Sequence, residues 1–224
     1  MIKKVNILST RVLNSSLIQK INTTRINFIS NNFIDIKPID FDKTALFDAS
    51  KNWVISSKNT LKILFDSISE SHLKTINFYC VGDKTARIIK SKGFNLVTSA
   101  LSSKELGTII EQNYINESFT LIGGVIKRDE LKSLLKNLCI NFTDISIYDT
   151  IFTPLIFTNE LDGILFFSPS AIHSFILKNT IKNEQLFCIG QTTASEALKY
   201  SKNVHISKNQ TFESVIGLVN QYYV

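Results

Sequence analysis

One seven-residue stretch of this chain returns, little changed, later in the sequence. CVGDKTA, from Cys80 to Ala86, is matched by CIGQTTA, from Cys188 to Ala194. In both copies an apolar, strand-like run ends at a glycine, and a Thr-Ala pair then opens a stretch with helical spacing. In TARIIKSKG, Gly93 is placed to end that helix. Such repetition indicates either a duplicated architecture or two halves of one site.

Two further pairs of segments keep the same order. WVISSKNTLKILF, which begins at Trp53, corresponds to GILFFSPSAIHSFIL, which begins at Gly163, with Ser57 aligned on Ser168. TSALSSKELGTII corresponds in turn to ISKNQTFESVIGLV, and each has a polar turn followed by an amphipathic helix. Because all three pairs are about 110 residues apart, duplication explains them better than coincidence.

A fourth pair of segments breaks this order. FTLIGGVIKRDELKSLLKNL ends the first series, and its nearest partner is the N-terminal VNILSTRVLNSSLIQKI. Each has an apolar strand, a turn that contains an arginine (Arg128 and Arg11) and a helix. The order predicts that the N-terminal unit joins the C-terminal third in one domain, and that the middle of the chain is inserted as the other.

Repeated strand–helix units predict the fold class. We expect an α/β protein with two similar parallel-sheet domains, flavodoxin- or Rossmann-like, with helices on both faces of each sheet. The discontinuous domain 1 would comprise residues 1–35 and 154–224, and the inserted domain 2 residues 41–146. FIDIKPID and DISIYDTIFTP alternate apolar and polar residues as half-buried strands do. Residues 36–40 and 147–153 are therefore predicted to form a two-stranded linker.

Composition places the chain among globular proteins. It has 224 residues, of which 44% are hydrophobic and 20% charged. No apolar run is long enough to span a membrane, and the N-terminus is typical of a first strand rather than a signal peptide. The three cysteines form no CxxC pair, so we expect neither a disulfide nor a zinc site. Cys80 and Cys188 are predicted to be buried, reduced thiols, which fits a cytoplasmic protein.

The net charge of +6 and the isoelectric point near 9.1 allow three interpretations. One is a solvated surface with excess lysine, and another is a basic cleft for a polyanionic small ligand. Nucleic acid is the least favoured partner, because the basic residues form no run interleaved with aromatic side chains.

The repeated turns supply the candidate binding residues. Ser57, Thr85, Ser168 and Thr193 each lie where a predicted strand gives way to a helix. Ligands of open parallel sheets bind at the carboxyl ends of the strands, and helix N-termini favour anions. Hydroxyl residues at helix starts most often serve only as caps. Their matched positions in both halves nevertheless favour two edges that line one anion-binding cleft.

Several chemistries are disfavoured by the motifs. GDKTA, GQTTA and IGGVIKR lack the glycine spacing of dinucleotide sites and the GK[ST] of a P-loop. His72, His173 and His205 have no metal-binding spacing, and His173 is expected to have an ordinary surface or packing role. No Ser-His-Asp, Cys-His or paired-carboxylate arrangement is evident, so an enzyme of this sequence is expected to work without a metal or a covalent nucleophile.

Tyr148, in ISIYDT, lies on the second predicted linker strand, where alternation would point it to one face. Two interpretations stay open. The ring packs between the domains, or its phenol faces a cleft and donates a proton or hydrogen bond to a leaving hydroxyl.

The ordered set ILSTR, WVISSKN, CVGDKTA, GGVIKRDEL, ISIYDT, FFSPSA and CIGQTTA resembles the uroporphyrinogen-III synthase family over nearly the whole chain. The resemblance implies two α/β domains, a two-stranded linker and an active site between the domains. It implies cyclisation of hydroxymethylbilane, a linear tetrapyrrole polycarboxylate, to uroporphyrinogen III, with loss of water and inversion of ring D. No cofactor, nucleic-acid partner or membrane is implied, and a monomer suffices.

The family's functional positions fall on matching motifs. The resemblance implies a catalytic Tyr148 and substrate-binding residues Arg11, Ser57, Thr85, Ser168 and Thr193. CIGQTTA keeps two threonines, and alignment with Thr85 favours Thr193 over Thr192. Ser56 and Lys58 depart from the threonine and proline common in the family, which leaves the interpretation standing. A non-catalytic, two-lobed binding module for an anionic small molecule is the alternative.

Overall fold

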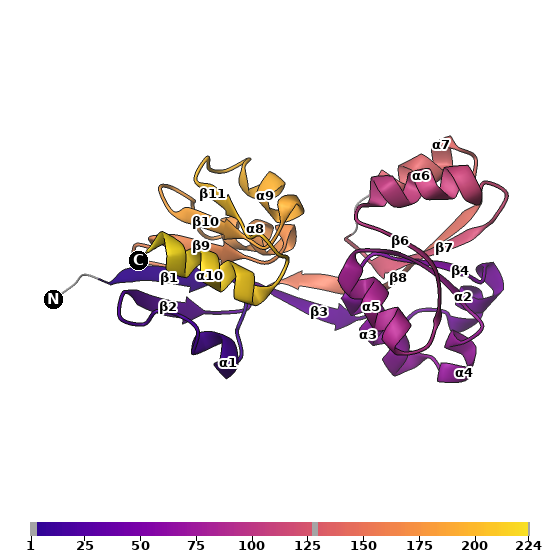
Figure 1. Ribbon diagram of the computed structural model, residues 1–224, viewed down its shortest axis with the longest axis horizontal. Coiled ribbons are helices and arrows are strands. Elements are labelled where there is room, and N and C mark those ends of the chain that lie inside the picture. The colour runs from indigo at the N-terminus through magenta and orange to yellow at the C-terminus, as the bar shows by residue number, and fades with distance from the viewer. Residues whose placement is uncertain (1–3, 127–129, 224) are drawn as a thin grey trace. The chain divides into compact units, whose positions relative to one another are not determined.

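The chain folds into two compact α/β units in a computed structural model that describes residues 4–126 and 130–223. Unit 1 comprises residues 1–35 and 151–224, and unit 2 comprises residues 36–150 (Figure 1). Each unit is built on a sheet of its own. The predicted fold class is confirmed: two similar parallel-sheet units, one of them discontinuous in sequence.

Unit 1 is built on a five-stranded parallel sheet in the order β11-β10-β9-β1-β2. Its strands are β1 (Val5–Ser9), β2 (Ile26–Ser30), β9 (Gly163–Phe166), β10 (Gln185–Cys188) and β11 (Val204–Ile206). The three neighbours β10, β9 and β1 are short apolar runs that pack on both faces. This is the pattern expected of strands covered by helices on either side.

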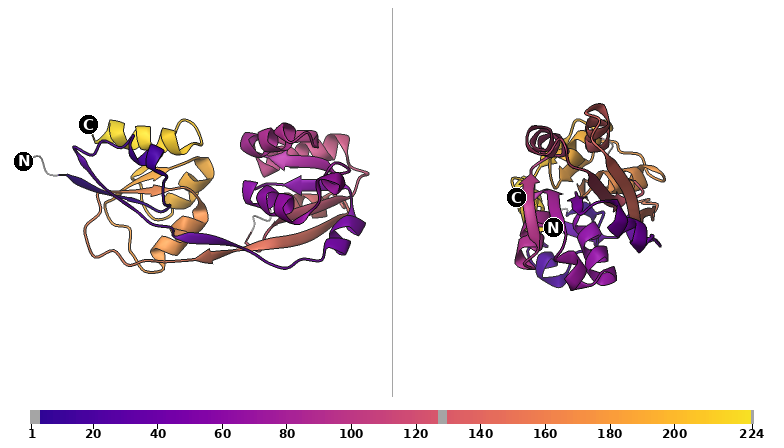
Figure 2. Two further views of the ribbon diagram at one scale, coloured as in Figure 1. Left: turned by 90° about the horizontal axis from the view of Figure 1, so that it is seen from below. Right: turned by 90° about the vertical axis from the view of Figure 1, so that its right-hand side faces the viewer.

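Helices cover both faces of the unit 1 sheet. The helices α1 (Ser15–Ile18) and α10 (Phe212–Tyr222) share a buried cluster with one face, and α8 (Pro169–Ile176) and α9 (Gln191–Ala197) with the other. Figure 2 shows the yellow α10 and the orange α8 and α9 on opposite faces. Adjacent residues of one strand enter different clusters, as Leu165 and Phe166 do, because strand side chains alternate between faces.

Unit 2 is built on a six-stranded sheet in the order β3-β8-β7-β4-β5-β6. Its strands are β3 (Ile34–Pro38), β4 (Asn52–Ile55), β5 (Asn77–Val81), β6 (Asn95–Ala100), β7 (Phe119–Gly124) and β8 (Phe142–Phe152). The pairs from β8 to β6 are all parallel. The helices α2 (Lys43–Ala49), α3 (Lys58–Ser67), α4 (Glu70–Leu73) and α5 (Asp83–Ser91) cover one face, and α6 (Ser103–Asn113) and α7 (Glu130–Asn137) the other.

The two sheets match each other once the change of order is allowed for. The order β6-β5-β4-β7-β8 in unit 2 corresponds to β11-β10-β9-β1-β2 in unit 1. The N-terminal strand β1 thus occupies the place of β7, as the rearranged fourth repeat predicts. Gly93 also ends its helix as expected, with a φ of +73° that glycine adopts without steric cost.

Two strands carry the chain from one unit to the other. β3 lies beside β8 in the sheet, and the amide of Ile39 donates to the carbonyl of Ile147 at 3.1 Å. The division between the units falls after Asp35, where the first expected crossing begins, and after Thr150, within the second. Both segments are strands, and they pair with each other in the two-stranded linker that the alternating sequence predicts.

Candidate functional site

Three of the six candidate residues follow neighbouring strands of unit 1. Arg11 comes after β1, Ser168 after β9 and Thr193 after β10, and these strands are adjacent and parallel. Their carboxyl ends therefore meet at one edge of the sheet. Ser57 and Thr85 follow the adjacent strands β4 and β5 of unit 2 in the same way. Each unit thus gathers its candidates at the edge where open parallel sheets bind ligands.

The two serines are helix caps. Ser57 Oγ accepts from the amide of Asn59 at 3.1 Å at the start of α3. Ser168 Oγ accepts from the amide of Ala171 at 3.2 Å at the start of α8. A serine just before the first helical residue satisfies one amide that has no partner within the helix. Both serines are half-buried, so their hydroxyls hold these turns at the surface of the sheet edge.

The two threonines also lie where a strand gives way to a helix, but they do not cap it. Gly82 and Gly190 are the capping residues of α5 and α9, and neither helix has a side-chain cap. Thr85 and Thr193 are the third residues of these helices and are buried, with exposed fractions of 5% and 3%. They lie inside the first turn because the glycine three residues earlier caps the helix.

Arg11 is exposed and lies against an aromatic ring. Its guanidinium carbon is 5.5 Å from the centroid of the Phe212 ring, at the start of α10. The Phe212 ring in turn lies 4.9 Å from that of Phe167, centroid to centroid. The Oγ of Ser9 donates to the carbonyl of Arg11 at 2.5 Å, which fixes the turn after β1. Arg128, its expected counterpart in unit 2, lies outside the described residues.

Tyr148 is buried in the core of unit 2, with an exposed fraction of 7%. Its ring lies against Gly124, the last residue of β7, and its carbonyl accepts from the amide of Val125 at 2.8 Å. Simple alternation would place Tyr148 on the face opposite Ile147, yet both side chains belong to one cluster. A shift in the β7–β8 register accounts for this difference.

Sequence reasoning did not find three residues that shape these edges. Thr10 Oγ1 donates to the carbonyl of Leu165 at 2.8 Å and ties the end of β1 to β9. The Arg11 guanidinium lies over the Phe212 ring, and the Tyr148 ring packs against Gly124. The Gly-Gly pair in IGGVIKR is the sequence signal for Gly124, although its spacing does not indicate contact with a tyrosine ring. No local signal pointed to Phe212, because its contact with Arg11 joins opposite ends of the chain.

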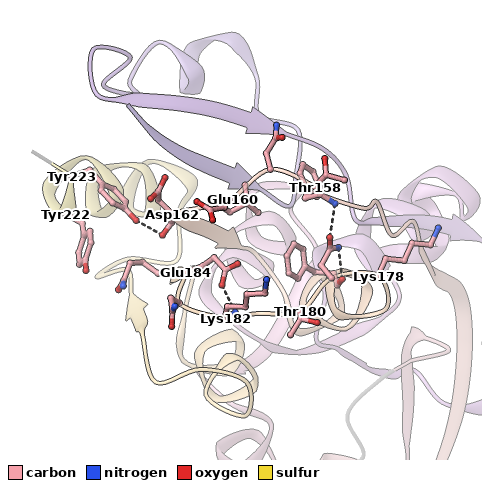
Figure 3. A pocket seen from close by; sticks show the side chains of 16 residues that line it. Thr158, Glu160, Asp162, Lys178, Thr180, Lys182, Glu184, Tyr222 and Tyr223 are labelled. Carbon is pink, nitrogen blue, oxygen red and sulfur yellow. Dashed lines mark hydrogen bonds between the residues drawn. The ribbon is translucent and has the colours of Figure 1, made fainter. Parts of the chain in front are cut away.

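A cavity of about 650 Å³ opens at the other edge of the unit 1 sheet (Figure 3). Its lining comes from the segments before β9 and β10 and from the end of α10, so none of the candidate residues contributes to it. Asp162 accepts from the amide of Asn6 at 2.7 Å, and Glu184 from the amide of Lys182 at 2.6 Å. Because charges of both signs mix here and these carboxylates are already engaged, the cavity favours no class of ligand.

Cys80, Cys188 and His173 have packing roles. All three cysteines are free, Cys80 and Cys188 are buried as predicted, and Cys139 is exposed. Burial raises the pKa of Cys80 to about 11 and that of Cys188 to about 12, so both thiols stay protonated at neutral pH. His173 Nε2 lies 2.9 Å from Glu196 Oε1, which joins α8 to α9.

The described residues contain neither a metal-binding cluster nor a helix that could span a membrane. Within residues 4–126 and 130–223, no three His, Cys, Asp or Glu side chains are grouped so that they could hold a metal ion. In the same part of the chain, none of the helices has the length and apolar character needed to cross a membrane.

Solved structures of similar fold cover nearly the whole chain. Uroporphyrinogen-III synthetase from Helicobacter pylori matches with a TM-score of 0.68 at 15% identity, over 97% of this chain and 99% of that one. A mutant uroporphyrinogen III synthase from Thermus thermophilus gives 0.74 at 11% identity, over 97% and 98%. The wild-type Thermus protein gives 0.60 at 12% identity, over 97% of each chain. At these identities the likeness establishes the fold.

Family membership comes from the sequence itself. No curated protein matches the chain. A family model described as uroporphyrinogen-III synthase HemD matches residues 16–217, which include β2 to β11 and five of the six candidate residues. The match also runs through both crossings between the units. The chain belongs to the uroporphyrinogen-III synthase family.

Proposed function

We propose that this protein is a uroporphyrinogen-III synthase, a lyase of tetrapyrrole (haem) biosynthesis that cyclises hydroxymethylbilane to uroporphyrinogen III. The observation that carries the proposal is the family match over residues 16–217. The reaction removes the terminal hydroxyl of the bilane as water, inverts ring D through a spiro intermediate and closes the macrocycle.

The substrate-binding role falls to the sheet edges of both units. Arg11, Ser168 and Thr193 in unit 1, and Ser57 and Thr85 in unit 2, would hold substrate carboxylates. Support comes from their common place at the carboxyl ends of adjacent parallel strands. The starts of α3, α5 and α8 add backbone N–H groups and the positive end of a helix dipole, both of which attract carboxylates. The guanidinium of Arg11 can bind a carboxylate with two parallel hydrogen bonds.

Tyr148 is assigned the chemical role. Its phenol would donate a hydrogen bond to the terminal hydroxyl of the bilane as that group leaves. Support comes from the close placement of its ring against Gly124 at the end of β7. The larger share of catalysis is positioning: held carboxylates keep the attacking carbon of ring D close to the terminal methylene. Without this grip the bilane closes without inversion and gives the type I isomer.

We also infer that the enzyme needs no cofactor and works as a cytoplasmic monomer without nucleic acid or membrane. Elimination of water and ring closure need proton donation and orientation, both within reach of hydroxyl, guanidinium and amide groups. Three free thiols, two of them buried, suit a reducing compartment.

The experiment that tests the function is a coupled assay with product analysis. Porphobilinogen deaminase generates hydroxymethylbilane in the presence of the protein, and the oxidised isomers are separated by chromatography. We expect the type III isomer to predominate, at a rate proportional to protein concentration and unchanged by chelators. If only the type I isomer forms, at the uncatalysed rate, in the presence of protein that circular dichroism shows to be folded, the proposed enzyme activity is rejected. Bilane bound tightly without turnover would instead identify a two-lobed binding module.

A further inference from the structure

The pairing of β7 with β8 contains an irregularity next to Tyr148. Gly123 pairs with Ser146 and Gly124 pairs with Tyr148, so Ile147 is an extra residue on β8. Bulges of this kind are rare between parallel strands, and they are common beside active sites, where they redirect a side chain. The carbonyl of Ile147 accepts from the amide of Ile39 on the other side of β8, so the extra residue remains within the sheet.

The bulge decides which face of the sheet receives the tyrosine. Ile145 and Ile147 have the same parity along β8, and both pack in the cluster beneath α3 and α5. In a regular strand Tyr148 would point to the opposite face, toward the cluster of α6 and α7. Because of the extra residue it packs with Ile147 instead. The register shift therefore determines the direction of the phenol.

Gly124 determines how closely the ring can approach the sheet. A methyl group at this position would lie 2.6 Å from Cε2, 2.8 Å from Cζ and 3.2 Å from Cδ2 of Tyr148. The first two distances are shorter than those that side-chain carbons adopt, so the ring occupies space that only a glycine leaves empty. The backbone at Gly124 does not have the positive φ that favours glycine. Alanine can therefore adopt the backbone conformation, and the tyrosine ring is the one group among its nearest neighbours that it would displace.

We propose that Gly124 is a positioning residue for the reaction: together with the bulge at Ile147, it holds the Tyr148 phenol where it meets the leaving hydroxyl. The proposal rests on the proposed function. The hydrogen bond from the amide of Val125 to the carbonyl of Tyr148 holds the main chain of Tyr148 in place. Moving the ring off Gly124 therefore moves the phenol oxygen without breaking this part of the sheet.

The test is the substitution Gly124→Ala, measured in the coupled assay with isomer analysis. We expect kcat to fall about 10- to 100-fold, the size of loss that follows a displacement of about 1 Å. KM should change far less, because the proposed carboxylate-binding residues follow strands other than β7 and β8. Uncatalysed closure should then supply more type I isomer.

A double-mutant cycle with Tyr148→Phe separates positioning from packing. The phenylalanine keeps the ring and therefore keeps the clash, so Gly124→Ala should lower the urea midpoint by a similar amount in both backgrounds. Its effect on kcat should nearly vanish when the hydroxyl is already gone. A role in packing alone would give the same loss of kcat with and without the hydroxyl.

Gly107→Ala is the matched control in the same unit. A methyl group at Gly107 would lie 2.8 Å from Cδ1 of Leu134, which is the mobile end of an aliphatic side chain. This variant introduces the same chemical change at a buried glycine of α6, remote from the bulge. Its kcat and its isomer ratio should match those of the wild type.

The outcomes distinguish the possible failures. Wild-type protein that makes no type III isomer removes the proposed function, and this inference with it. If the wild type is active but Tyr148→Phe has full kcat, the role of the phenol is wrong and Gly124 has nothing to position. If Tyr148→Phe is impaired while Gly124→Ala is fully active, or if the two losses of kcat add independently, the positioning role alone is overturned.

Discussion

Thr85 and Thr193 occupy the same place in the two units: each is the third residue of its helix, buried three positions after a glycine. One main-chain hydrogen bond is repeated as well, since the amide of Ala86 donates to Gly82 at 3.1 Å and that of Ala194 to Gly190 at 3.0 Å. The capping glycines themselves differ, because Gly82 has a φ of +94° and Gly190 has an extended backbone. We expect the two hydroxyls to make equivalent contributions to substrate binding.

Thr85→Val and Thr193→Val test this equivalence. Valine keeps the shape of threonine and removes only the hydroxyl, so each variant should stay folded. A lost hydrogen bond to a carboxylate should lower kcat/KM about 10-fold in either case. Steady-state kinetics in the coupled assay gives the values. Thr85→Ser and Thr193→Ser, which keep the hydroxyl, are the controls and should retain most of the activity; full activity in both valine variants would remove the threonines from the binding site.

The contact between Arg11 and Phe212 predicts an effect on binding. Phe212→Leu removes the ring over which the guanidinium lies and leaves the charge in place. A cation–π contact at an exposed site contributes about 0.5–1 kcal/mol, so KM should rise about 2- to 5-fold while kcat stays the same. Arg11→Ala should raise KM further. Tyr200→Leu, which removes another exposed aromatic ring of unit 1, is the control and should have no effect.

Asparagines form a ladder along the amino ends of three strands in unit 2. Asn77 donates to Asn52 at 3.0 Å and Asn95 donates to Asn77 at 2.7 Å, in register across β4, β5 and β6. Asn77→Ala breaks both bonds and should lower the free energy of unfolding by about 1–2 kcal/mol. Asn95→Ala breaks only one of them and should cost about half as much. Urea denaturation measures both losses. Equal losses would contradict the prediction that Asn77 contributes through two hydrogen bonds and Asn95 through one.

His205 predicts a dependence of stability on pH. It stacks on Phe187 at 5.1 Å and lies beside Tyr222, and burial lowers its pKa from the usual 6.5. The unfolded chain therefore binds a proton more readily, and the free energy of unfolding should fall as the pH drops below 6.5. His205→Gln should remove this slope, as urea titrations at several pH values can establish. His72→Gln is the control and should leave the slope intact.

The sequence predicted the architecture because the repeats record it directly. CVGDKTA and CIGQTTA mark equivalent strand–helix turns, and the displaced partner of GGVIKR requires β1 to stand where β7 does. Ser57 and Ser168 were correctly placed at helix starts, because capping depends on residues adjacent in sequence. Local chemistry and repetition together sufficed for these features.

Features that depend on contacts between distant segments could not be predicted. Alternation along ISIYDT points Tyr148 to one face but does not show which, because the bulge beside it depends on pairing with β7. Thr85 and Thr193 lie in the first turns of their helices as expected, with Gly82 and Gly190 at the capping positions. Phe212 and Arg11 are far apart in the sequence, so the residues around each of them do not predict the contact.

The position of β1 has a consequence for biosynthesis. Unit 2 is one continuous segment, so all its strands from β4 to β8 have been made before the ribosome reaches β9. β1 is made before the other described strands, yet in the unit 1 sheet it lies between β2 and β9, with Leu8 beside Ile164. The inserted unit can thus fold during translation before β1 has β9 to pair with. Unit 1 can complete its sheet only after β9, β10 and β11, which follow the whole of unit 2 in the chain, have been made.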